Sequence, residues 1–530
     1  MAVFKDRNNT LLAQLSAEFQ ARPRAFQTVP MQDSSSKFLL DAVLEDKFGL
    51  NSFRPKQLEV IAAIMSGKHT LALLPTGYGK SLCYQVPSQI LPGITLVVSP
   101  LIALMQDQLS GLWKRGIRNA TCLNSSIEAY ELDDRIASIA SGDTKLVYVA
   151  PERFESARFR NLLSSVNISL VVIDEAHCIS QWGHDFRLQY RNLSTYLAKL
   201  KGTTVLALTA TATPHVQKDI VKTLGLPRMN VITANFDRPN LQFHVKALSN
   251  IGEKEDQLLK LLSKSSDGSS IVYTSSRRES ERIAAVLRES KHSACHYHAG
   301  MSNSERQRNQ YSFESGRANI IVSTVAFGMG IDKPDIRQVV HFNMPPSLEN
   351  YYQEAGRAGR DGEHAHCSLL FQPKDISTQK WLISKNYPAD EELALIYRAV
   401  KDRGLNPIKP QELIKTLNIS ETAMMSSLSL LKELQLIDAS ADGGYFQRSN
   451  EEYPKIDTTP LSQRKQHELT RLQNIINYLN AKRCRREEIL DYFGQKLEGS
   501  CSGCDVCHDT NAAVAAVASN SIVGFGSVNI

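Results

Sequence analysis

Long apolar runs are missing from this sequence. No stretch of the 530 residues reaches the roughly 18 consecutive apolar residues that a membrane-spanning helix needs. The first twenty residues, MAVFKDRNNTLLAQLSAEFQ, also lack the apolar core of a secretory signal, and they contain the carboxylates Asp6 and Glu18, which weaken a transit-peptide interpretation. We therefore expect a cytoplasmic protein without a membrane partner, although an organelle location stays open.

The chain also lacks a strong excess of either charge. Its formal net charge is +6, with 42% hydrophobic and 22% charged residues, as in an ordinary soluble protein. A mildly basic balance permits a polyanionic partner without demonstrating one. The length is enough for about three to four domains.

No repeat is visible residue by residue, yet one pattern occurs twice. Short runs that are apolar on both faces alternate with helical patterns over residues 37–240, and the alternation resumes over 241–375. Such runs are typical of parallel sheets in α/β domains, so we predict two of these domains in tandem. The predicted strands lie at 70–75, 95–100, 145–151, 169–175 and 204–211, and then at 269–276, 318–328, 338–345 and 366–373.

Residues 376–460 have a different pattern, which reads as helix, turn, helix and a glycine-containing hairpin. Ser420 is placed to cap the second helix, whose apolar face comprises Met424, Leu428, Leu431 and Leu434. This favours a winged-helix-like segment. A small accessory helical domain without nucleic-acid contact is an equal alternative. The terminal segments 1–36 and 511–530 are expected to be a loosely attached tail and a disordered tail.

Four cysteines gather in residues 461–510, a helical region rich in arginine and lysine. Cys501, Cys504 and Cys507 are separated by two-residue gaps, and Cys484 precedes them. Four thiolates at such spacing suit a closed tetrahedral Zn²⁺ site, although an iron–sulfur cluster is chemically possible. We predict a helical zinc-binding subdomain in which the metal is structural.

A glycine loop follows the first predicted strand. Pro75-Thr76-Gly77-Tyr78-Gly79-Lys80-Ser81 lies between a strand and a helix, with Leu74 where the strict P-loop pattern has glycine. Glycines let backbone amides approach phosphate oxygens, the lysine neutralises outer phosphates, and the serine hydroxyl can ligate Mg²⁺. The loop predicts a nucleotide site.

Two adjacent carboxylates end the fourth predicted strand. In P-loop enzymes a second strand carries an aspartate that holds Mg²⁺, which suits Asp174. Glu175 would point differently and could polarise an attacking water. The alternative, a solvated strand end, is weak because the glycine loop lies upstream.

The order of motifs resembles that of superfamily 2 helicases, and most closely the RecQ family of DNA helicases. The resemblance covers 38–375 nearly continuously and resumes at 483–507, and the loop QWGHDFR directly after Asp-Glu-Ala-His is its most diagnostic part. The motifs are FRPKQ (53–57), PTGYGKS (75–81), SPLIALMQDQ (99–108), DEAHCISQWGHDFR (174–187), LTATAT (208–213), YTSSRRESE (273–281), YHAGM (297–301), STVAFGMGIDKPDIR (323–337) and YYQEAGRAGRDG (351–362).

The resemblance implies two RecA-like motor domains and assigns roles to residues. Gln57, with Arg54 beside it, would read the adenine. His177 would link the ATP site to the other parts of the motor. Arg357 and Arg360 would reach the γ-phosphate when the domains close, with Arg360 slightly favoured as the arginine finger. A loop that senses single-stranded DNA would comprise Gln181, Trp182, His184, Phe186 and Arg187, whose polar members favour exposure over burial of the aromatics in the core.

The chain departs from the family after the second motor domain. RecQ proteins usually place the zinc subdomain there and the winged helix after it, whereas here the winged-helix-like segment precedes the cysteines. We expect no room for the further C-terminal domain of some relatives. This order of segments puts strand separation by a wing hairpin and the binding of branched DNA in doubt.

We nevertheless expect an ATP- and Mg²⁺-dependent helicase, translocating 3′ to 5′ on single-stranded and forked DNA in recombination and repair. We expect it to be nucleoid-associated and monomeric, with a single-stranded-DNA-binding protein as a possible partner. An RNA helicase and a DNA-dependent ATPase or scaffold that does not unwind are the alternatives.

Overall fold

The computed structural model describes most of the chain between residues 34 and 508. The described ranges are 34–124, 127–183, 185, 187–200, 202–226, 228–263, 268–327, 333–387, 389–440, 442–448, 459–501 and 503–508. The predicted disordered segment 511–530 lies outside them, as does the predicted tail up to residue 33. Helix α2 (Ser34–Phe48) begins inside that tail and buries Leu39, Leu40 and Leu44.

The first lobe is a seven-stranded parallel sheet between helices. Its strand order is β3-β4-β2-β5-β6-β1-β7. The strands are β1 (Thr70–Leu73), β2 (Ile94–Val98), β3 (Ala120–Leu123), β4 (Leu146–Val149), β5 (Ile168–Ile173), β6 (Thr204–Thr209) and β7 (Asn230–Thr233). The helices are α2, α3 (Pro55–Met65), α4 (Leu82–Ser88), α5 (Ile102–Lys114), α6 (Ala129–Ser141), α7 (Ala157–Ser165), α8 (Leu188–Arg191), α9 (Leu193–Leu197) and α10 (Pro214–Leu224), with short 3₁₀ turns at Pro151–Glu155 and Ala176–Ile179.

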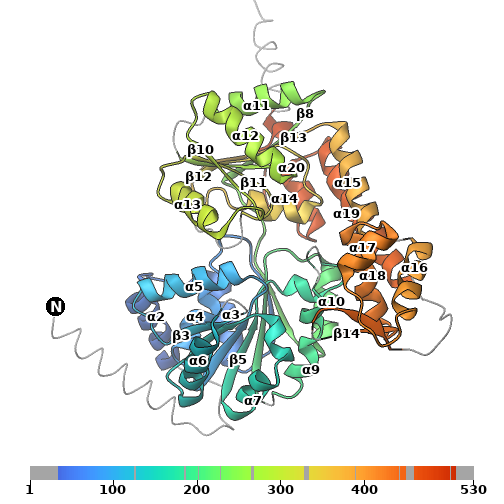
Figure 1. Cartoon of the computed structure of the whole chain (residues 1–530). Coiled ribbons are helices and arrows are strands. Elements are labelled where there is room, and N and C mark those ends of the chain that lie inside the picture. Colours follow the sequence, from blue (N-terminus) through green and yellow to red (C-terminus); the bar gives the residue numbers. More distant parts are fainter. Residues whose placement is uncertain are drawn as a thin grey trace, which may run out of the picture.

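The second lobe is a six-stranded parallel sheet, and Figure 1 shows it above the first. Its strand order is β10-β11-β9-β12-β13-β8. The strands are β8 (Leu241–Ala247), β9 (Ser269–Tyr273), β10 (Ala294–Tyr297), β11 (Ile320–Ser323), β12 (Ile336–His341) and β13 (Ala365–Phe371). The helices are α11 (Ile251–Ser263), α12 (Arg277–Glu289), α13 (Asn303–Glu314) and α14 (Leu348–Ala355). The prediction of two tandem parallel-sheet domains is confirmed.

Helices and one hairpin make up the rest of the chain. They are α15 (Pro373–Asn386), α16 (Asp390–Lys401), α17 (Pro410–Leu417), α18 (Glu421–Glu433), the antiparallel pair β14 (Ile437–Ala439) and β15 (Tyr445–Gln447), α19 (Thr459–Asn480) and α20 (Arg485–Tyr492). Ser420 caps α18 as predicted, because its hydroxyl accepts a hydrogen bond from Ala423 N at 3.3 Å. Helix α15 packs against α19 and α18, and Figure 1 shows α16, α17 and α18 below α15 and α19, to the right of the first lobe.

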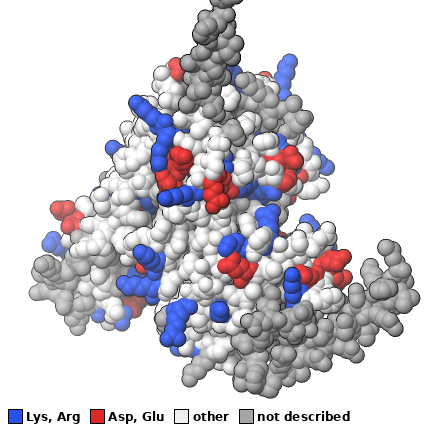
Figure 2. Space-filling view, turned by 180° about the vertical axis from the view of Figure 1, so that it is seen from behind, with Lys and Arg blue, Asp and Glu red and all other residues white. Residues whose placement is uncertain are grey.

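The surface carries no dominant charge on the face seen in Figure 2. Lysine and arginine side chains alternate there with aspartate and glutamate. This agrees with the small net charge. This face therefore has no broad basic patch that would indicate binding of a polyanion. Among the described residues, no helix combines the length and the apolar character that crossing a membrane requires.

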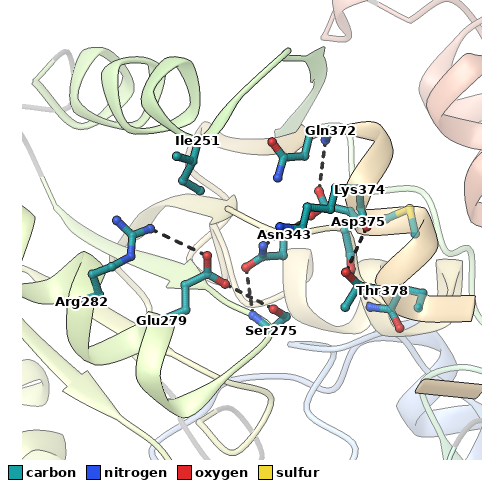
Figure 3. Close-up of a pocket in the computed structure, with 11 residues that line it drawn as sticks. Ile251, Ser275, Glu279, Arg282, Asn343, Gln372, Lys374, Asp375 and Thr378 are labelled. Atoms are coloured by element: carbon teal, nitrogen blue, oxygen red, sulfur yellow. Dashed lines mark hydrogen bonds and ion pairs between the residues drawn. The ribbon is translucent and has the colours of Figure 1, made fainter. Parts of the chain in front are cut away.

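A buried ion pair joins α11 to the start of α15 in the second lobe. Lys254, whose side chain is fully buried, donates to Asp375 Oδ2 at 2.7 Å and to Phe342 O at 2.8 Å. Asp375 also accepts from Gln372 N at 3.1 Å, and it lines the polar pocket of Figure 3. In that pocket Ser275 N donates to Asn343 Oδ1 at 3.0 Å. The Asn343 side chain therefore links the segments that follow β9 and β12.

Replacing Lys254 by methionine is expected to lower the free energy of unfolding of this lobe by about 3–5 kcal/mol, because Asp375 would keep a buried charge without its partner. Urea denaturation followed by circular dichroism measures the change. Lys56→Met is the control, since the exposed Lys56–Glu59 pair (2.6 Å) is expected to contribute at most about 1 kcal/mol. Equal effects of the two substitutions would contradict the account.

Candidate functional site

The glycine loop lies between β1 and α4, at the carboxyl end of the first sheet. Gly77 and Gly79 have φ angles of +78° and +80°, which side-chain-bearing residues rarely adopt. A Cβ atom on Gly79 would also lie 2.6 Å from Gln57 Nε2. Ser81 directly precedes α4, and its hydroxyl does not cap that helix. The loop therefore has the backbone shape that close approach to phosphate requires.

Arg54 and Gln57 hold this loop from α3. The Gln57 amide nitrogen donates to Tyr78 O at 2.8 Å and to Gly79 O at 3.0 Å, while its Oε1 accepts from Arg54 N at 2.8 Å. Arg54 donates to Gly77 O at 2.9 Å. In this conformation both polar ends of the Gln57 amide bind backbone, so the structure shows it supporting the loop.

Asp174 and Glu175 lie at the end of β5, close to Lys80. Burial and repulsion from Glu175 raise the pKa of Asp174, burial raises the pKa of Glu175, and the Lys80 ammonium opposes both shifts. Burial also lowers the pKa of Lys80. Two crowded carboxylates beside one lysine form a site that a divalent cation would stabilise.

Glu175 has a backbone conformation that signals local strain. Its φ and ψ are 48° and 49°, in the left-handed region that a glutamate seldom occupies. Its Oε2 is buried, lies 3.4 Å from His177 Nδ1, and accepts no hydrogen bond from the described residues. An acceptor without a donor in a buried position suits a carboxylate that would receive a hydrogen bond from water.

His177 connects this strand end to the end of β6. Its Nδ1 lies 3.0 Å from Thr209 Oγ1, which also accepts a hydrogen bond from Thr211 N at 3.2 Å. Burial lowers the pKa of His177 to about 3, so the ring is neutral at physiological pH. The contacts of the neutral His177 ring are therefore hydrogen bonds and not ion pairs.

Arg357 and Arg360 approach the site from the second lobe. A Cβ atom on Gly77 would lie 3.2 Å from Arg360 Cγ, and one on Gly356 would lie 3.3 Å from Thr76 Cβ. Arg357 is 5% exposed, and its buried Nε has no hydrogen-bond partner among the described residues. The structure thus places Arg360 directly on the glycine loop and Arg357 close enough to Glu175 for its charge to lower the pKa of that carboxyl.

The loop after β5 lies against helix α19. The half-buried ring of Trp182 has centroid distances of 5.5 Å to His215 and 5.2 Å to His467, and His467 Nε2 lies 2.8 Å from Trp182 O. Arg187 donates to Pro100 O at 2.8 Å. Gln181 is half-buried in the same loop. His184 and Phe186 lie outside the described residues.

The four predicted metal ligands come together. The Sγ atoms of Cys484, Cys501, Cys504 and Cys507 all lie within 4.8 Å of one another, and none forms a disulfide. Cys507 N donates to Cys504 Sγ at 3.4 Å, a contact that favours thiolate. A cluster of four thiols at this separation fits a tetrahedral Zn²⁺, which would join α20 to the segment 501–507.

Arg238 lies where the two lobes meet, and the sequence pattern did not reveal it. It lies in the linker between β7 and β8, and it donates hydrogen bonds to Thr76 O at 3.2 Å and to Ala358 O at 2.9 Å. In the sequence, this residue marks only the predicted boundary between the domains 37–240 and 241–375. Nothing in the local pattern indicates which backbone atoms such an arginine contacts.

Three family models match the chain. The model of the DEAD/DEAH box helicase matches residues 54–220, that of the helicase conserved C-terminal domain matches 253–362, and that of RecQ zinc-binding matches 446–508. The second and third matches are separated by residues 363–445, which include the segment from α16 to β14.

Curated relatives match over most of the chain. The ATP-dependent DNA helicase RecQ of Bacillus subtilis is 36% identical over 475 residues, which is 89% of this chain and 67% of that protein. RecQ of Pasteurella multocida is 36% identical over 91% of this chain and 64% of its own length. A protein of B. subtilis named as a probable ATP-dependent DNA helicase, RecS, is 35% identical over 88% of this chain and 92% of its own length. The chain thus spans about two thirds of these two RecQ proteins and nearly all of RecS.

Solved structures share the fold of the motor. The helicase MrfA bound to DNA and AMPPNP matches with a TM-score of 0.54 and 19% identity, covering 80% of this chain and 63% of that one. The Mycobacterium smegmatis helicase Lhr bound to single-stranded DNA and AMP-PNP matches with a TM-score of 0.51 and 21% identity, covering 77% and 60%. The family models, the relatives and the zinc cluster agree, and the chain belongs to the RecQ family of ATP-dependent DNA helicases.

Proposed function

We propose that this chain is a motor that hydrolyses ATP to move 3′ to 5′ along single-stranded DNA and to unwind duplex DNA in recombination or repair. The observation that carries the proposal is the contact of the two lobes at the glycine loop. Lys80, Asp174 and Glu175 belong to one lobe and Arg357 and Arg360 to the other, so a nucleotide bound in this cleft would touch both.

The chemistry of hydrolysis follows from these positions. Lys80 would neutralise the outer phosphates, and Glu175 would accept a hydrogen bond from the attacking water through its unpaired oxygen. Asp174 and the Ser81 hydroxyl would hold Mg²⁺. The two arginines would stabilise charge on the transferred phosphoryl group only when the lobes are closed, which makes closure a condition of hydrolysis.

A route from the nucleotide to DNA is supported by the contacts after β5. His177 bonds to Thr209 on one side, and a Cβ on Gly183 would lie 2.1 Å from His177 O, so the loop carrying Trp182 packs tightly on the histidine. A shift of the strand end would therefore move this loop. Aromatic side chains suit the binding of single-stranded DNA because they stack on any base.

Stimulation of ATPase activity separates the proposal from its rivals. Single-stranded DNA is expected to raise kcat by at least tenfold, and RNA of the same sequence is expected to have little effect. Lys80→Ala is expected to lower the stimulated kcat by about 10²–10³-fold, because it removes a preorganised charge at the phosphates. Exposed Lys68→Ala is the control with activity retained. Stronger stimulation by RNA would favour an RNA helicase.

A further inference from the structure

One short linker connects the two lobes, and Arg238 occupies its centre. The linker runs from the end of β7 at Thr233 to the start of β8 at Leu241. The Arg238 guanidinium donates to Thr76 O in the glycine loop at 3.2 Å. It also donates to three carbonyls of the second lobe, those of Gly356 (3.3 Å), Ala358 (2.9 Å) and Gly359 (2.9 Å).

The acceptors of Arg238 lie in the glycine loop and beside the two arginines of the second lobe. Thr76 belongs to the loop that would bind phosphates. The carbonyls of residues 356 and 359 directly precede Arg357 and Arg360 in the chain, and the carbonyl of residue 358 lies between the two arginines in sequence. A guanidinium offers five donors in a rigid plane, so it can fix the relative position of several carbonyls at once. Arg238 thus aligns the backbone that carries both arginines with the glycine loop.

The zinc-binding subdomain holds the same linker from its other side. Arg486, two residues after the metal ligand Cys484, donates from Nε to Asp237 Oδ1 at 2.9 Å and forms a second bond to the same carboxylate. Gln495 accepts from Phe236 N at 2.8 Å and donates to Ala234 O at 2.9 Å. Three linker residues that precede Arg238, namely Ala234, Phe236 and Asp237, are therefore bound to this subdomain.

An aromatic contact adds to these hydrogen bonds. The rings of Phe236, Phe493 of the zinc-binding subdomain and Tyr352 of α14 contact one another. The centroid distances are 5.1 Å for Phe236–Phe493, 6.0 Å for Phe236–Tyr352 and 5.2 Å for Tyr352–Phe493. The Tyr352 hydroxyl also donates to Phe236 O at 2.5 Å. The linker is thus a packed element with defined partners on three sides.

We propose that Arg238 is a positioning residue for ATP hydrolysis, and that the zinc-binding subdomain keeps it in place through the Asp237–Arg486 pair. Arg238 does not reach the reacting atoms in this role. It sets where Arg357 and Arg360 lie when the lobes close, and the subdomain fixes the linker from which it acts. This inference rests on the proposed ATPase function and assigns a second role, beyond structural support, to the zinc-binding subdomain.

Steady-state ATPase assays with saturating single-stranded DNA test the role of Arg238. Arg238→Gln is expected to lower kcat by about 10²-fold, since small misplacements of catalytic groups have effects of that size. The KM for ATP is expected to stay within about threefold, because the glycine loop, Lys80 and Gln57 are unchanged. Arg238→Lys keeps the charge but not the planar fork, so it is expected to restore less than about a tenth of the activity.

Two measurements separate positioning from simple structural support. The thermal midpoint of Arg238→Gln is expected to stay within about 2 °C of the wild type, and a fluorescent ATP analogue is expected to bind with an affinity within about threefold. Arg115→Gln is the matched control, because Arg115 is exposed and donates to one carbonyl, Gly111 O, at 3.1 Å. An unchanged kcat in Arg238→Gln, full rescue by lysine, or a kcat loss that tracks a lowered midpoint would each overturn the proposal.

A double-mutant cycle tests the part played by the zinc-binding subdomain. Arg486→Gln is expected to lower kcat about tenfold while zinc remains at one equivalent per chain, and the combined variant is expected to be no slower than Arg238→Gln alone. Multiplicative losses, or an unchanged kcat in Arg486→Gln, would remove the subdomain from this role. If the wild-type chain itself shows no DNA-stimulated ATPase, the proposed function fails; losses confined to the variants concern Arg238 only.

Discussion

Arg360→Ala is expected to lower the DNA-stimulated kcat for ATP hydrolysis by about 10³–10⁵-fold, the range known for arginine fingers. Of Arg357 and Arg360, it is Arg360 whose side chain lies against Gly77 of the glycine loop. Its charge would therefore lie beside the outer phosphates of a bound nucleotide. The measurement is single-turnover hydrolysis with excess enzyme, which separates the chemical step from product release.

Arg357→Ala gives the informative comparison. Arg357 is more deeply buried, and its positive charge favours the ionised form of Glu175, whose pKa it lowers. We expect a smaller loss than for Arg360→Ala. Binding of a fluorescent ATP analogue is expected to change little in both variants, since the loop and Lys80 remain. A loss in Arg360→Ala of less than tenfold would contradict the assignment of the finger.

Cys504→Ser is expected to abolish zinc binding and to unfold the region around α20. Cys504 is fully buried and pairs with Phe243 of β8, so the metal site is attached to the edge of the second sheet. Structural Zn²⁺ sites contribute about 10–16 kcal/mol of apparent binding free energy, which exceeds the stability of most domains. Elemental analysis for zinc and limited proteolysis measure the two effects.

The control for this substitution is Cys295→Ser. Cys295 is a half-buried thiol of β10, outside the cluster, and its Sγ contacts Asn309 O at 3.6 Å. We expect it to retain one zinc per chain and the proteolysis pattern of the wild type. Retention of zinc in Cys504→Ser, or detection of iron in place of zinc in the wild type, would contradict the structural zinc site.

The strands that the sequence predicted differ from those it missed in one physical respect. All nine predicted runs overlap a strand, and each of these nine strands pairs with a neighbouring strand on both sides. The missed strands β3, β7, β8 and β10 are the four at the sheet edges. An edge strand needs fewer buried side chains, as β7 shows with only Ile232 buried, so no continuous apolar run marks it.

The residues of the candidate site also differ in how far the sequence could predict them. Side chains that act within one motif, such as Lys80 and Glu175, were predictable because glycine loops and paired carboxylates have their chemistry in the local sequence. The roles of Arg238 and of His467 beside Trp182 depend on contacts between segments far apart in the chain. Gln57 was predicted to contact adenine, and this prediction is still to be tested with nucleotide bound.

Strand separation on a duplex with a single overhang tests the central claim most directly. The wild-type chain with ATP and Mg²⁺ is expected to unwind a duplex with a 3′ overhang at least tenfold faster than one with a 5′ overhang, and Lys80→Ala is expected to unwind neither. DNA-stimulated ATP hydrolysis without unwinding of either duplex would contradict the helicase account, and it would leave a DNA-dependent ATPase whose C-terminal segment does not separate strands.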